Sequence, residues 1–272
     1  METVQLNNGI ALPLLGLGTW DLRGESCTRL VMEALAMGYR LIDTAQMYDN
    51  ETAVGKGLAQ SRVPRDEVFL TTKIYRPSNS YYKAKQAIDA SLLSLGVDYV
   101  DLLLLHEPYR EGPEMYHALE EALRVGKVRA IGISNYNLSH YINFLAQCDI
   151  VPAVNQLECH IFFQKEDVQR EMMQHGTVLQ AWAPLASGEA GVCDNEVLAE
   201  IGASHGKTAA QVALRFLVQR GISAIPKSKQ LVRLRENIDV FDFELSEEEM
   251  TILYAMDRGT TFFPWTEAFD LS

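Results

Sequence analysis

Short apolar runs alternate along the chain with longer segments in which apolar residues recur every three or four positions. From residue 15 onward this alternation repeats eight times. Parallel strands need long crossover connections, so the alternation predicts a parallel sheet. Residues 102–105 are apolar at every position, which is typical of a strand buried on both faces. Eight such units favour the α/β class and a closed (β/α)8 TIM barrel.

The pattern gives approximate bounds for each unit. The expected strands are residues 15–18, 41–42, 68–72, 99–105, 130–133, 153–157, 177–181 and 222–225. The expected helices are residues 26–37, 51–60, 82–95, 113–125, 138–146, 164–174, 196–204, 208–219, 231–238 and 246–256. No Pro/Gly/Ser-rich linker or charge block separates these elements, so we expect residues 1–272 to form a single domain.

The first residues follow the pattern of a β-hairpin. Val4 and Leu6 alternate with polar residues, and residues 10–14 return as a mostly apolar run. Between them, Asn8 and Gly9 favour left-handed dihedrals and predict a two-residue type I′ turn. The hairpin stands outside the eight units, and we expect it to close the bottom of the barrel.

Composition narrows the function classes. The 272 residues have a formal net charge of −12, which repels polyanions and disfavours nucleic-acid binding. The chain begins without a basic segment followed by an apolar one, and no apolar run approaches the length of a membrane span. We therefore expect a soluble, cytoplasmic protein without membrane contact. An anionic ligand would need a local basic pocket on such an acidic chain.

Common nucleotide and metal motifs are incomplete. Gly16 and Gly18 begin a G-x-G pattern, but Asp21 stands where the dinucleotide-binding fingerprint needs its third glycine. The four cysteines match neither a zinc spacing nor a Cys-x-x-Cys motif. Cys159 and His160 are neighbours near a strand end, so their side chains should point to opposite faces. No metal site is expected.

Four polar residues follow successive predicted strands. Asp43 and Tyr48 come after the second strand, Lys73 after the third and His106 after the fourth. Because the carboxyl ends of barrel strands converge on one face, these four groups can form one proton-transfer site. Taken singly, each has another interpretation. Asp43 could cap a turn, Tyr48 could be packing, Lys73 could reach solvent, and His106 could be a hydrogen-bonded core residue.

With their flanking residues, these positions resemble the aldo-keto reductase superfamily over nearly the whole chain. The matching stretches are GLGTW at 16–20, DTAQMYDNE at 43–51, TK at 72–73, DLLLLH at 101–106, GKVRAIGISNY at 126–136, NQLECH at 155–160, APL at 183–185 and IPKS at 225–228. Each stretch is weak by itself, whereas their order and spacing are specific. A tryptophan at position 182, where a tyrosine also occurs in the family, resembles the bacterial branch, which includes small aldehyde reductases.

The resemblance implies that the four residues reduce a carbonyl group with a nicotinamide cofactor. Tyr48 would donate a proton to the carbonyl oxygen as a general acid. Lys73 would lower the pKa of this phenol, which is ordinarily about 10, and Asp43 would keep Lys73 charged. His106 would position the carbonyl oxygen and stabilise its developing charge.

The resemblance also implies a cofactor site. Ser134, Asn135 and Gln156 would bind the nicotinamide carboxamide, and Trp182 would stack on its ring. The other positions that carry over are Gly18, Thr19, Trp20 and Asp43, then Leu185 and Ser187 along the pyrophosphate, Lys227, Ser228 and Arg233 at a 2′-phosphate, and Glu236 and Asn237 at the adenine. Lys227, Ser228 and Arg233 form the local basic pocket, at a helix start, that an anionic ligand needs on this acidic chain. The resemblance therefore implies NADPH as the cofactor and not NADH.

The expected substrate pocket combines aromatic rings with one carboxylate. Its residues are Trp20, Tyr48, Tyr75, His106, Glu107, Phe262, Phe263 and Trp265. The segments after His106 and Met256 are short, which predicts an open, shallow pocket for small aldehydes, α-dicarbonyls or keto-acid-like compounds. Glu107 either disfavours anionic substrates or points to solvent. A small carbonyl compound is the expected partner, and the protein is expected to be a monomer or a weak oligomer.

Two other classes of protein share parts of this pattern. A non-catalytic NADPH-binding sensor or partner subunit would keep the fold, although the complete set of four residues argues against it. A Schiff-base barrel aldolase would use Lys73 as a nucleophile, but Trp182 and a 2′-phosphate pocket would have no purpose there. The chain departs from the family pattern outside the four residues, with Ala183 for serine, Ala186 for glycine and Ile161 for proline.

Overall fold

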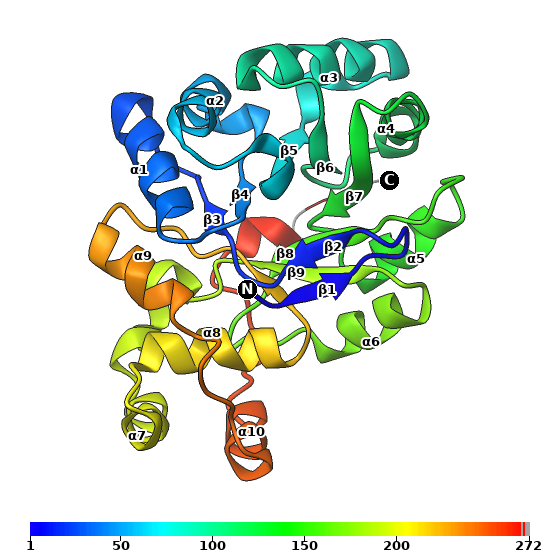
Figure 1. The fold of residues 1–272 in the computed structure, drawn as a ribbon. Helices are drawn as coiled ribbons and strands as arrows, with labels where there is room; N and C mark the ends of the chain where they lie inside the picture. The colour runs from blue at the N-terminus through cyan, green and yellow to red at the C-terminus, as the bar shows by residue number, and fades with distance from the viewer. Residues whose placement is uncertain (268, 270–272) are drawn as a thin grey trace.

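Eight parallel strands form one barrel in the computed structural model, which describes residues 1–267 and residue 269. The strands follow sequence order around the sheet, and helices surround it (Figure 1). Gly16 N–H donates to Ala224 O at 2.9 Å, which joins the first and last strands and closes the expected (β/α)8 barrel. The strands are β3 (Leu17–Gly18), β4 (Leu41–Asp43), β5 (Phe69–Ile74), β6 (Val100–Leu105), β7 (Val128–Ser134), β8 (Val154–Glu158), β9 (Val178–Trp182) and β10 (Ser223–Ala224).

The helices lie where the apolar periodicity places them. They are α1 (Gly24–Ala36), α2 (Glu51–Gln60), α3 (Tyr81–Leu95), α4 (Gly112–Arg124), α5 (Leu138–Leu145), α6 (Glu166–Gln174), α7 (Glu196–His205), α8 (Ala209–Gln219), α9 (Leu231–Ile238) and α10 (Glu247–Tyr254). The bounds of α2 and α9 are those predicted, and the others differ by at most two residues at either end. The periodicity did not predict the short 3-10 helices η1 (Gln46–Tyr48), η2 (Arg65–Glu67), η3 (Arg76–Ser78), η4 (Ala186–Asp194) and η5 (Pro264–Glu267).

Local sequence sets several helix ends. The side chains of Ser80 and Asn137 accept N–H groups from the first turns of α3 and α5. Thr208 and Ser246 complete capping boxes at the starts of α8 and α10. Gly96 ends α3 with a φ of +66°, a conformation that glycine adopts without strain.

The N-terminal hairpin has a different turn from the one predicted. Its strands β1 (Thr3–Gln5) and β2 (Ala11–Pro13) pair antiparallel, and Leu6 N–H donates to Ile10 O at 2.9 Å. The loop therefore holds three residues, and within it only Gly9 takes a positive φ, of +82°. The predicted two-residue type I′ turn is wrong. Asn8 instead donates through its side chain to Arg129 O at 2.9 Å, which fixes the loop against the barrel.

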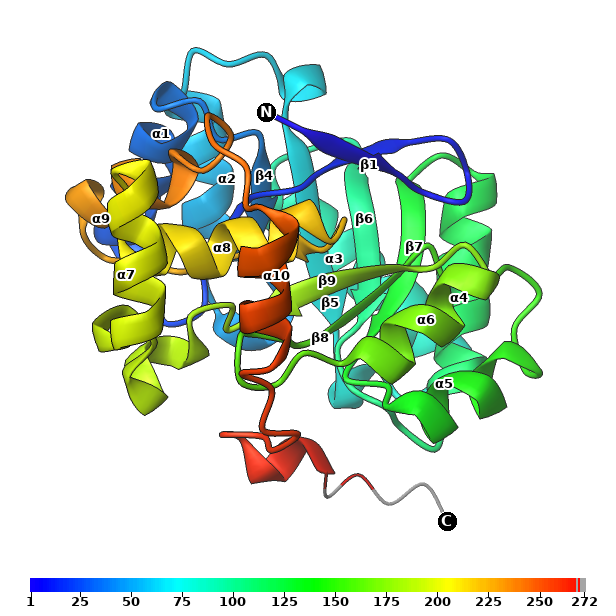
Figure 2. The ribbon, with the colours of Figure 1, turned by 90° about the horizontal axis from the view of Figure 1, so that it is seen from below.

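The hairpin closes the amino end of the barrel, as expected. Buried apolar side chains from the hairpin and from the barrel strands and the residues next to them form one cluster: Leu6, Leu12, Leu41, Phe69, Leu102, Leu104, Ala130, Ala153, Val154 and Ile225. A second, larger cluster packs the helices against the outside of the sheet. Figure 2 shows the hairpin at one end of the barrel and the C-terminal segment at the other.

Candidate active site

The four residues predicted to be catalytic meet at the carboxyl ends of β4, β5 and β6. Lys73 Nζ lies 2.6 Å from Asp43 Oδ1 and 3.3 Å from the Tyr48 hydroxyl oxygen. Lys73 also donates to Thr44 O at 3.0 Å. The rings of Tyr48 and His106 meet edge to face, with 5.5 Å between their centroids. These four residues form one cluster, in which Lys73 and Asp43 are buried.

The loop that carries Tyr48 is held by a buried asparagine. Tyr48 ends η1, and Asp49 follows with a φ of +51°, which turns the chain toward α2. Asn50 accepts a hydrogen bond from Thr44 Oγ1 at 2.6 Å and donates one to Leu22 O at 3.0 Å. Although Asn50 immediately precedes α2, its side chain makes no capping hydrogen bond to that helix. It ties the loops after β3 and β4 together and so fixes the position of the phenol.

Burial and the lysine act in opposite directions on Tyr48. Burial raises the pKa of Tyr48, and the Lys73 cation offsets only part of that rise. Lys73 lowers the pKa of Tyr48, as predicted, but burial is the larger effect, so the pKa of Tyr48 lies above its usual value. For Lys73, burial by itself would lower the pKa, but Asp43 and Tyr48 together raise it. The site therefore holds a protonated phenol beside an ammonium ion at neutral pH.

His106 is a neutral imidazole in this site. Burial, with a further contribution from the Lys73 cation, holds the pKa of His106 well below its usual value of 6.5. Its Nδ1 atom is buried without a hydrogen-bond partner among the described residues. Asn135 Nδ2 donates to the backbone oxygen of His106 at 3.0 Å and so holds the end of β6. A neutral imidazole in this position has one N–H to donate.

A chain of buried amides continues from Asp43 across the barrel. Gln156 Nε2 donates to Asp43 Oδ2 at 2.8 Å and to Gln180 Oε1 at 2.7 Å. Gln180 in turn donates to Ser223 Oγ at 3.2 Å. Gln156, predicted to bind a carboxamide, is thus also an orienting partner of the Asp43 carboxylate. Gln180 was not among the predicted site residues; an amide in the middle of the apolar strand β9 could have indicated it.

Ser134, Asn135 and Trp182 lie together beside these residues. Ser134 Oγ donates to Gln156 O at 3.0 Å, and Trp182 Nε1 donates to Asn135 Oδ1 at 2.9 Å. Asn135 has a φ of +66°, in the left-handed region that asparagine tolerates better than most residues. The residues predicted to surround the nicotinamide are therefore neighbours at the ends of β7, β8 and β9.

Aromatic side chains from the C-terminal segment cover Trp182. Phe263 contacts it edge-on with 5.0 Å between centroids, and Trp265 is nearly parallel to it at 5.9 Å. Trp265 and Trp20 are both exposed, and Tyr75 is half-buried. Phe262 faces the other way, over the ring of His160 at 5.3 Å between centroids. Phe263 and Trp265 thus pack on Trp182, whereas Phe262 packs on His160.

Glu107 is not simply a solvent-facing residue. It is half-buried, and its Oε2 accepts a hydrogen bond from the Tyr109 hydroxyl at 3.0 Å. Burial raises the pKa of Glu107, while Tyr109 and Arg76 oppose that rise. Its charge acts on Tyr48, whose pKa it helps to raise. A carboxylate is therefore part of the electrostatic environment of the phenol.

Cations gather beside the loop after β3. Lys229 Nζ lies 2.7 Å from Asp21 Oδ2, and Lys227 Nζ lies 3.8 Å from the same atom. The Lys227 ammonium also sits 5.4 Å from the centre of the Trp20 ring. Gly18 packs against the loop after β10, which carries Lys227, since a Cβ added to Gly18 would lie 3.7 Å from Lys227 Cβ. Gly18 and Trp20, predicted to bind the cofactor, and Lys227, predicted to bind its 2′-phosphate, thus come from adjoining loops.

The remaining predicted cofactor residues lie around α9 and along β3 and β9. Arg233 is exposed and pairs with Glu236 at 2.9 Å, and Asn237 on the same helix is buried. Ser228 Oγ accepts a hydrogen bond from Gln230 N–H at 3.0 Å. The other positions are Thr19, whose hydroxyl donates to Asp43 O at 2.9 Å, half-buried Leu185 and exposed Ser187.

The loop after β9 is strained. Ala183, Ala186 and Ser187 have φ values of +47°, +51° and +54°, in the left-handed region that favours glycine. The family pattern has glycine at position 186. Alanine therefore adds a methyl group at a backbone conformation that favours a residue without a side chain. The backbone turn is nevertheless kept, because Ala186 N–H donates to Ala183 O at 2.8 Å.

Comparison with known proteins agrees with this geometry. The profile of the Aldo/keto reductase family matches residues 14–258. The chain belongs to this family. It is 43% identical over 250 residues to 9,11-endoperoxide prostaglandin H2 reductase of Trypanosoma cruzi (strain CL Brener), covering 91% of this chain and 88% of that protein. It is 40% identical over 259 residues to glyoxal reductase of Bacillus subtilis (strain 168), covering 94% and 93%.

A solved structure shows the same fold. The crystal structure of MGS-M4, an aldo-keto reductase enzyme from a Medee basin deep-sea metagenome library, aligns with a TM-score of 0.95 at 38% identity. The alignment covers 98% of this chain and 100% of that one. The chain is thus an oxidoreductase of the aldo/keto reductase family with the barrel expected of it. Within the described residues, no helix is both long and apolar enough to cross a membrane.

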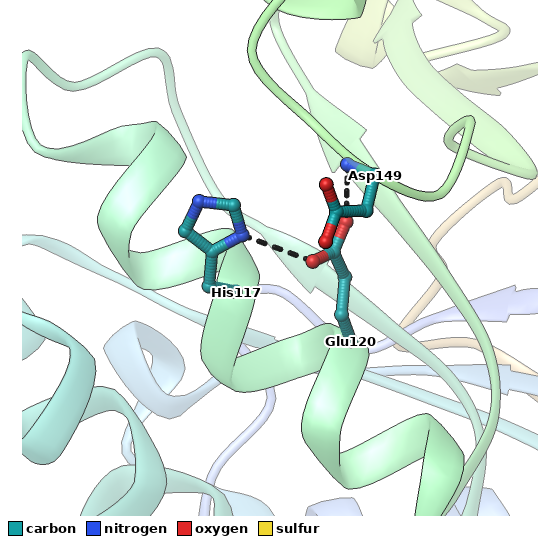
Figure 3. A group of neighbouring side chains, drawn as sticks. All are labelled: His117, Glu120 and Asp149. Atoms are coloured by element: carbon teal, nitrogen blue, oxygen red, sulfur yellow. Dashed lines mark hydrogen bonds and ion pairs between the residues drawn. The ribbon is translucent and has the colours of Figure 1, made fainter.

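Two polar features of this family member lie outside the catalytic cluster. The first joins α4 to the loop before β8 (Figure 3). Glu120 Oε1 accepts N–H groups from Asp149 and Ile150 at 2.8 Å, and Glu120 Oε2 lies 3.0 Å from His117 Nδ1. Arg124 lies within 4 Å of both carboxylates. Because these acids already have backbone and cationic partners, we interpret the cluster as a structural brace.

The second feature is a surface groove of about 1110 Å³ between α1 and α2. Glu25, Arg29 and Lys56 give its walls mixed charge, and it reaches the back of the tyrosine loop at Asn50. None of the four clustered residues lines it. The candidate active site is therefore defined by converging side chains at the strand ends and not by this groove.

Proposed function

We propose that the protein reduces small aldehydes and ketones, α-dicarbonyls in particular, to alcohols with NADPH. The observation that carries this proposal is the position of the Lys73 ammonium between the Asp43 carboxylate and the Tyr48 hydroxyl, at 2.6 and 3.3 Å. When bound, NADPH supplies the hydride. The residues of the chain then have two tasks, which are to hold the carbonyl and to deliver a proton to its oxygen.

Tyr48 is suited to the proton transfer. An ammonium group has donors only, so the Tyr48 oxygen accepts from Lys73 and its own proton stays free for another acceptor. Negative charge develops on the carbonyl oxygen during reduction, and the Lys73 cation stabilises the phenolate that Tyr48 becomes after donating. Asp43, held in turn by Gln156, keeps the ammonium group in place.

His106 is suited to hold the carbonyl oxygen. Its lowered pKa makes it a neutral hydrogen-bond donor that does not compete with Tyr48 as an acid. The edge-to-face contact between the two rings holds the two side chains next to each other. A carbonyl oxygen between them would receive two hydrogen bonds that strengthen as its charge develops.

The donor set fits a nicotinamide dinucleotide. Asn135 and Ser134 offer amide and hydroxyl groups beside Trp182, whose indole provides a flat face. Lys227 and Arg233 provide exposed positive charge on a chain with a net charge of −12. We propose that Arg233 binds the 2′-phosphate, since a guanidinium fork matches phosphate oxygens.

The cofactor proposal is tested by Arg233→Met. We expect the Kd for NADPH to rise about tenfold, or about 1.4 kcal/mol, while the Kd for NADH stays unchanged. Arg235→Met is the matched control, because Arg235 is exposed on the same helix but points away from Arg233. Fluorescence titration measures the Kd of each cofactor for wild type and for both variants. Equal losses for both cofactors would contradict a role at the 2′-phosphate.

The reaction itself is tested with Tyr48→Phe. NADPH oxidation is followed by absorbance with methylglyoxal and a panel of short aldehydes. We expect turnover to fall about 10²- to 10⁴-fold, the usual contribution of a general acid, with NADPH binding retained. A wild-type protein that binds NADPH but reduces none of these compounds would instead favour the sensor or partner-subunit function.

The substrate class is a separate point. One relative is named a glyoxal reductase and another a prostaglandin H2 reductase, so the family members differ widely in substrate size. We favour the small class because the segment between β6 and α4, residues 106–111, is short and leaves the substrate pocket open. Turnover of short dicarbonyls is compared with turnover of a steroid ketone. A strong preference for the steroid would overturn this part.

The geometry gives no support to a Schiff-base aldolase. A Schiff-base lysine must be a neutral amine, whereas Asp43 and Tyr48 raise the pKa of Lys73 and keep it charged. Borohydride trapping with a carbonyl substrate separates the two mechanisms. A covalent adduct at Lys73 would favour the aldolase, and its absence alongside NADPH-dependent turnover would favour the reductase.

A further inference from the structure

A buried carboxylate outside the catalytic cluster holds the C-terminal segment. Glu158, 3% exposed, is the last residue of β8. Its Oε1 accepts N–H groups from Phe262 at 3.1 Å and from His160 Nε2 at 3.0 Å. Its Oε2 accepts a short hydrogen bond from the Thr261 hydroxyl. One carboxylate thus receives three donors, two of them from residues more than 100 positions later in the chain.

The histidine partner is fixed in one tautomer. His160 Nδ1 accepts the backbone N–H of Phe162 at 3.2 Å, so the ring proton of the neutral imidazole lies on Nε2 and points to Glu158. His160 is fully buried, and the ring of Phe262 lies over it. The mechanism proposed above uses neither His160 nor Glu158, so their hydrogen bonds need another explanation.

The contacts of Glu158 belong to a longer attachment. We call residues 257–266 the C-terminal strap; it lies at the end of the barrel opposite the hairpin (Figure 2). Arg258 N–H donates to Phe162 O at 3.0 Å, and its guanidinium lies 3.9 Å from the centre of the Phe162 ring. Thr261 Oγ1 accepts the N–H of Phe263 at 2.8 Å. Glu158 therefore fixes the turn from which Phe263 leaves toward the active site.

The strap brings its aromatic rings onto Trp182. Glu158 and Trp182 are register partners on β8 and β9, so the anchor and the covered ring stand side by side. Phe263 and Trp265 pack on Trp182 at 5.0 and 5.9 Å between centroids. A cavity of about 220 Å³ lies beneath the strap, with Glu158, Asn135 and Thr266 among its walls. Thr266 of the strap and Glu158 thus line one cavity with Asn135, whose side chain donates to the backbone oxygen of His106.

We propose that Glu158 is a positioning residue, which holds the strap so that Phe263 and Trp265 form an aromatic wall and select carbonyl substrates with an apolar or aromatic substituent. This inference rests on the reductase function proposed above. Buried hydrogen bonds to a charged acceptor are stronger than neutral ones. A glutamine at position 158 keeps the size of the side chain but removes its charge, and it replaces one acceptor oxygen with an NH2 group, so the Thr261 hydroxyl would have to accept where it now donates.

The experiment compares Glu158→Gln with wild type on phenylglyoxal and methylglyoxal, two dicarbonyls that differ by the ring. We expect the KM for phenylglyoxal to rise about tenfold in the variant, because the aromatic wall is lost, and kcat for methylglyoxal to stay within about twofold. Glu200→Gln, the same change at an exposed site on α7, is the matched control. An unchanged ratio of the two KM values would overturn the substrate role.

A second measurement needs neither cofactor nor substrate. Trypsin cleavage after Arg258 reports release of the strap, and we expect it to be at least several-fold faster in Glu158→Gln than in Glu200→Gln. Equal cleavage rates would overturn the anchoring role. If wild type reduces neither dicarbonyl, the proposed function fails, and cleavage alone decides whether Glu158 anchors the strap.

A second, less disruptive variant keeps the proposal testable if Glu158→Gln does not fold. Should Glu158→Gln lose the native circular dichroism signal, Thr261→Val takes its place, because it removes a single donor from outside the barrel. We expect Thr261→Val to shift both measurements in the same direction by a smaller factor, and Thr261→Ser to restore wild-type values. A valine variant that behaves like wild type in both measurements would overturn the proposal.

Discussion

The two ends of the barrel are built from the same strands but have opposite chemistry. At the amino end, Leu41 and Phe69 begin β4 and β5 and pack with Leu102 under the hairpin. At the carboxyl end, the first two of these strands present Asp43 and Lys73 to the active site. Asp43 lies two residues after Leu41 on β4, and Lys73 lies four residues after Phe69 on β5. Each strand thus leads from an apolar cluster to a buried ion pair within a few residues.

Backbone strain divides the molecule in the same way. Among the described residues, the non-glycine positions with positive φ are Asp21, Asp49, Asn135, Lys165, Ala183, Ala186 and Ser187. Each lies in a loop that follows the carboxyl end of a strand. Strained conformations cost free energy and persist where surrounding structure enforces them, often at functional sites. We infer that packing at the amino end stabilises the fold, whereas the strained loops at the carboxyl end lower the free energy of unfolding where they form the active site.

The largest effect should come from breaking the buried ion pair with Lys73→Met. This change leaves the Asp43 carboxylate buried without its cation. We expect the free energy of unfolding to fall by about 3–5 kcal/mol and NADPH-dependent turnover to fall about 10²-fold or more. Urea denaturation and a turnover assay measure the two losses.

A double variant separates stability from chemistry at this end. In Asp43→Asn with Lys73→Met no buried charge is left unpaired, so most of the lost stability should return. Turnover should not return, because Tyr48 still lacks its ammonium partner. If the double variant were as unstable as Lys73→Met, the unpaired carboxylate would not be the cause of the destabilisation.

The amino end should show the reverse behaviour, with loss of stability and unchanged chemistry. Leu102→Ala removes a fully buried side chain from the cluster under the hairpin. We expect the free energy of unfolding to fall by about 2–4 kcal/mol, with kcat at 25 °C unchanged in the folded protein. Leu93→Ala is the control, since Leu93 is 84% exposed and should change stability by less than about 0.5 kcal/mol. A large loss of kcat in Leu102→Ala would mean that the two ends are coupled.

Much of the fold could be predicted from the sequence because it depends on local patterns. Apolar periodicity gave α2 and α9 with their observed bounds. The positions of Asp43, Lys73 and His106 at strand ends were enough to place them on one face, since a parallel barrel leaves no other arrangement. The resemblance to the family supplied the role of Tyr48, whose loop has no strong pattern of its own.

The details that escaped prediction depend on contacts between distant residues. The side chain of Asn8, in the turn that differs from the prediction, donates to a backbone oxygen 121 positions away. Gln156 bonds to Asp43 across 113 positions, and Thr261 bonds to Glu158 across 103. The net pKa of Tyr48 depends on burial, which only the folded chain reveals. Such partners cannot be predicted from the local sequence, because they become neighbours only when the chain folds.

A smaller effect is expected from acid. His106 has a lowered pKa when folded, so below pH 6.5 the unfolded chain binds a proton that the folded chain does not. Its contribution to stability is complete above pH 6.5 and is lost as pH falls toward the folded pKa, by at most about 1.4 kcal/mol for each pH unit. Wild type should therefore lose more stability than His106→Asn between pH 7.5 and 5.5. Urea denaturation at both pH values tests this, and equal losses would rule out a neutral His106.

The smallest effect concerns the strain at the carboxyl end. Ser187 is exposed and has a φ of +54°, so glycine at this position relieves about 1 kcal/mol of steric strain. The greater entropy of glycine in the unfolded chain offsets about half of that gain. We expect Ser187→Gly to raise the free energy of unfolding by about 0.5 kcal/mol and Tm by about 1–2 °C. Ser187→Ala keeps the same strain and should not stabilise the protein. If alanine stabilised it as much as glycine did, the gain would come from removing the hydroxyl group and not from the backbone.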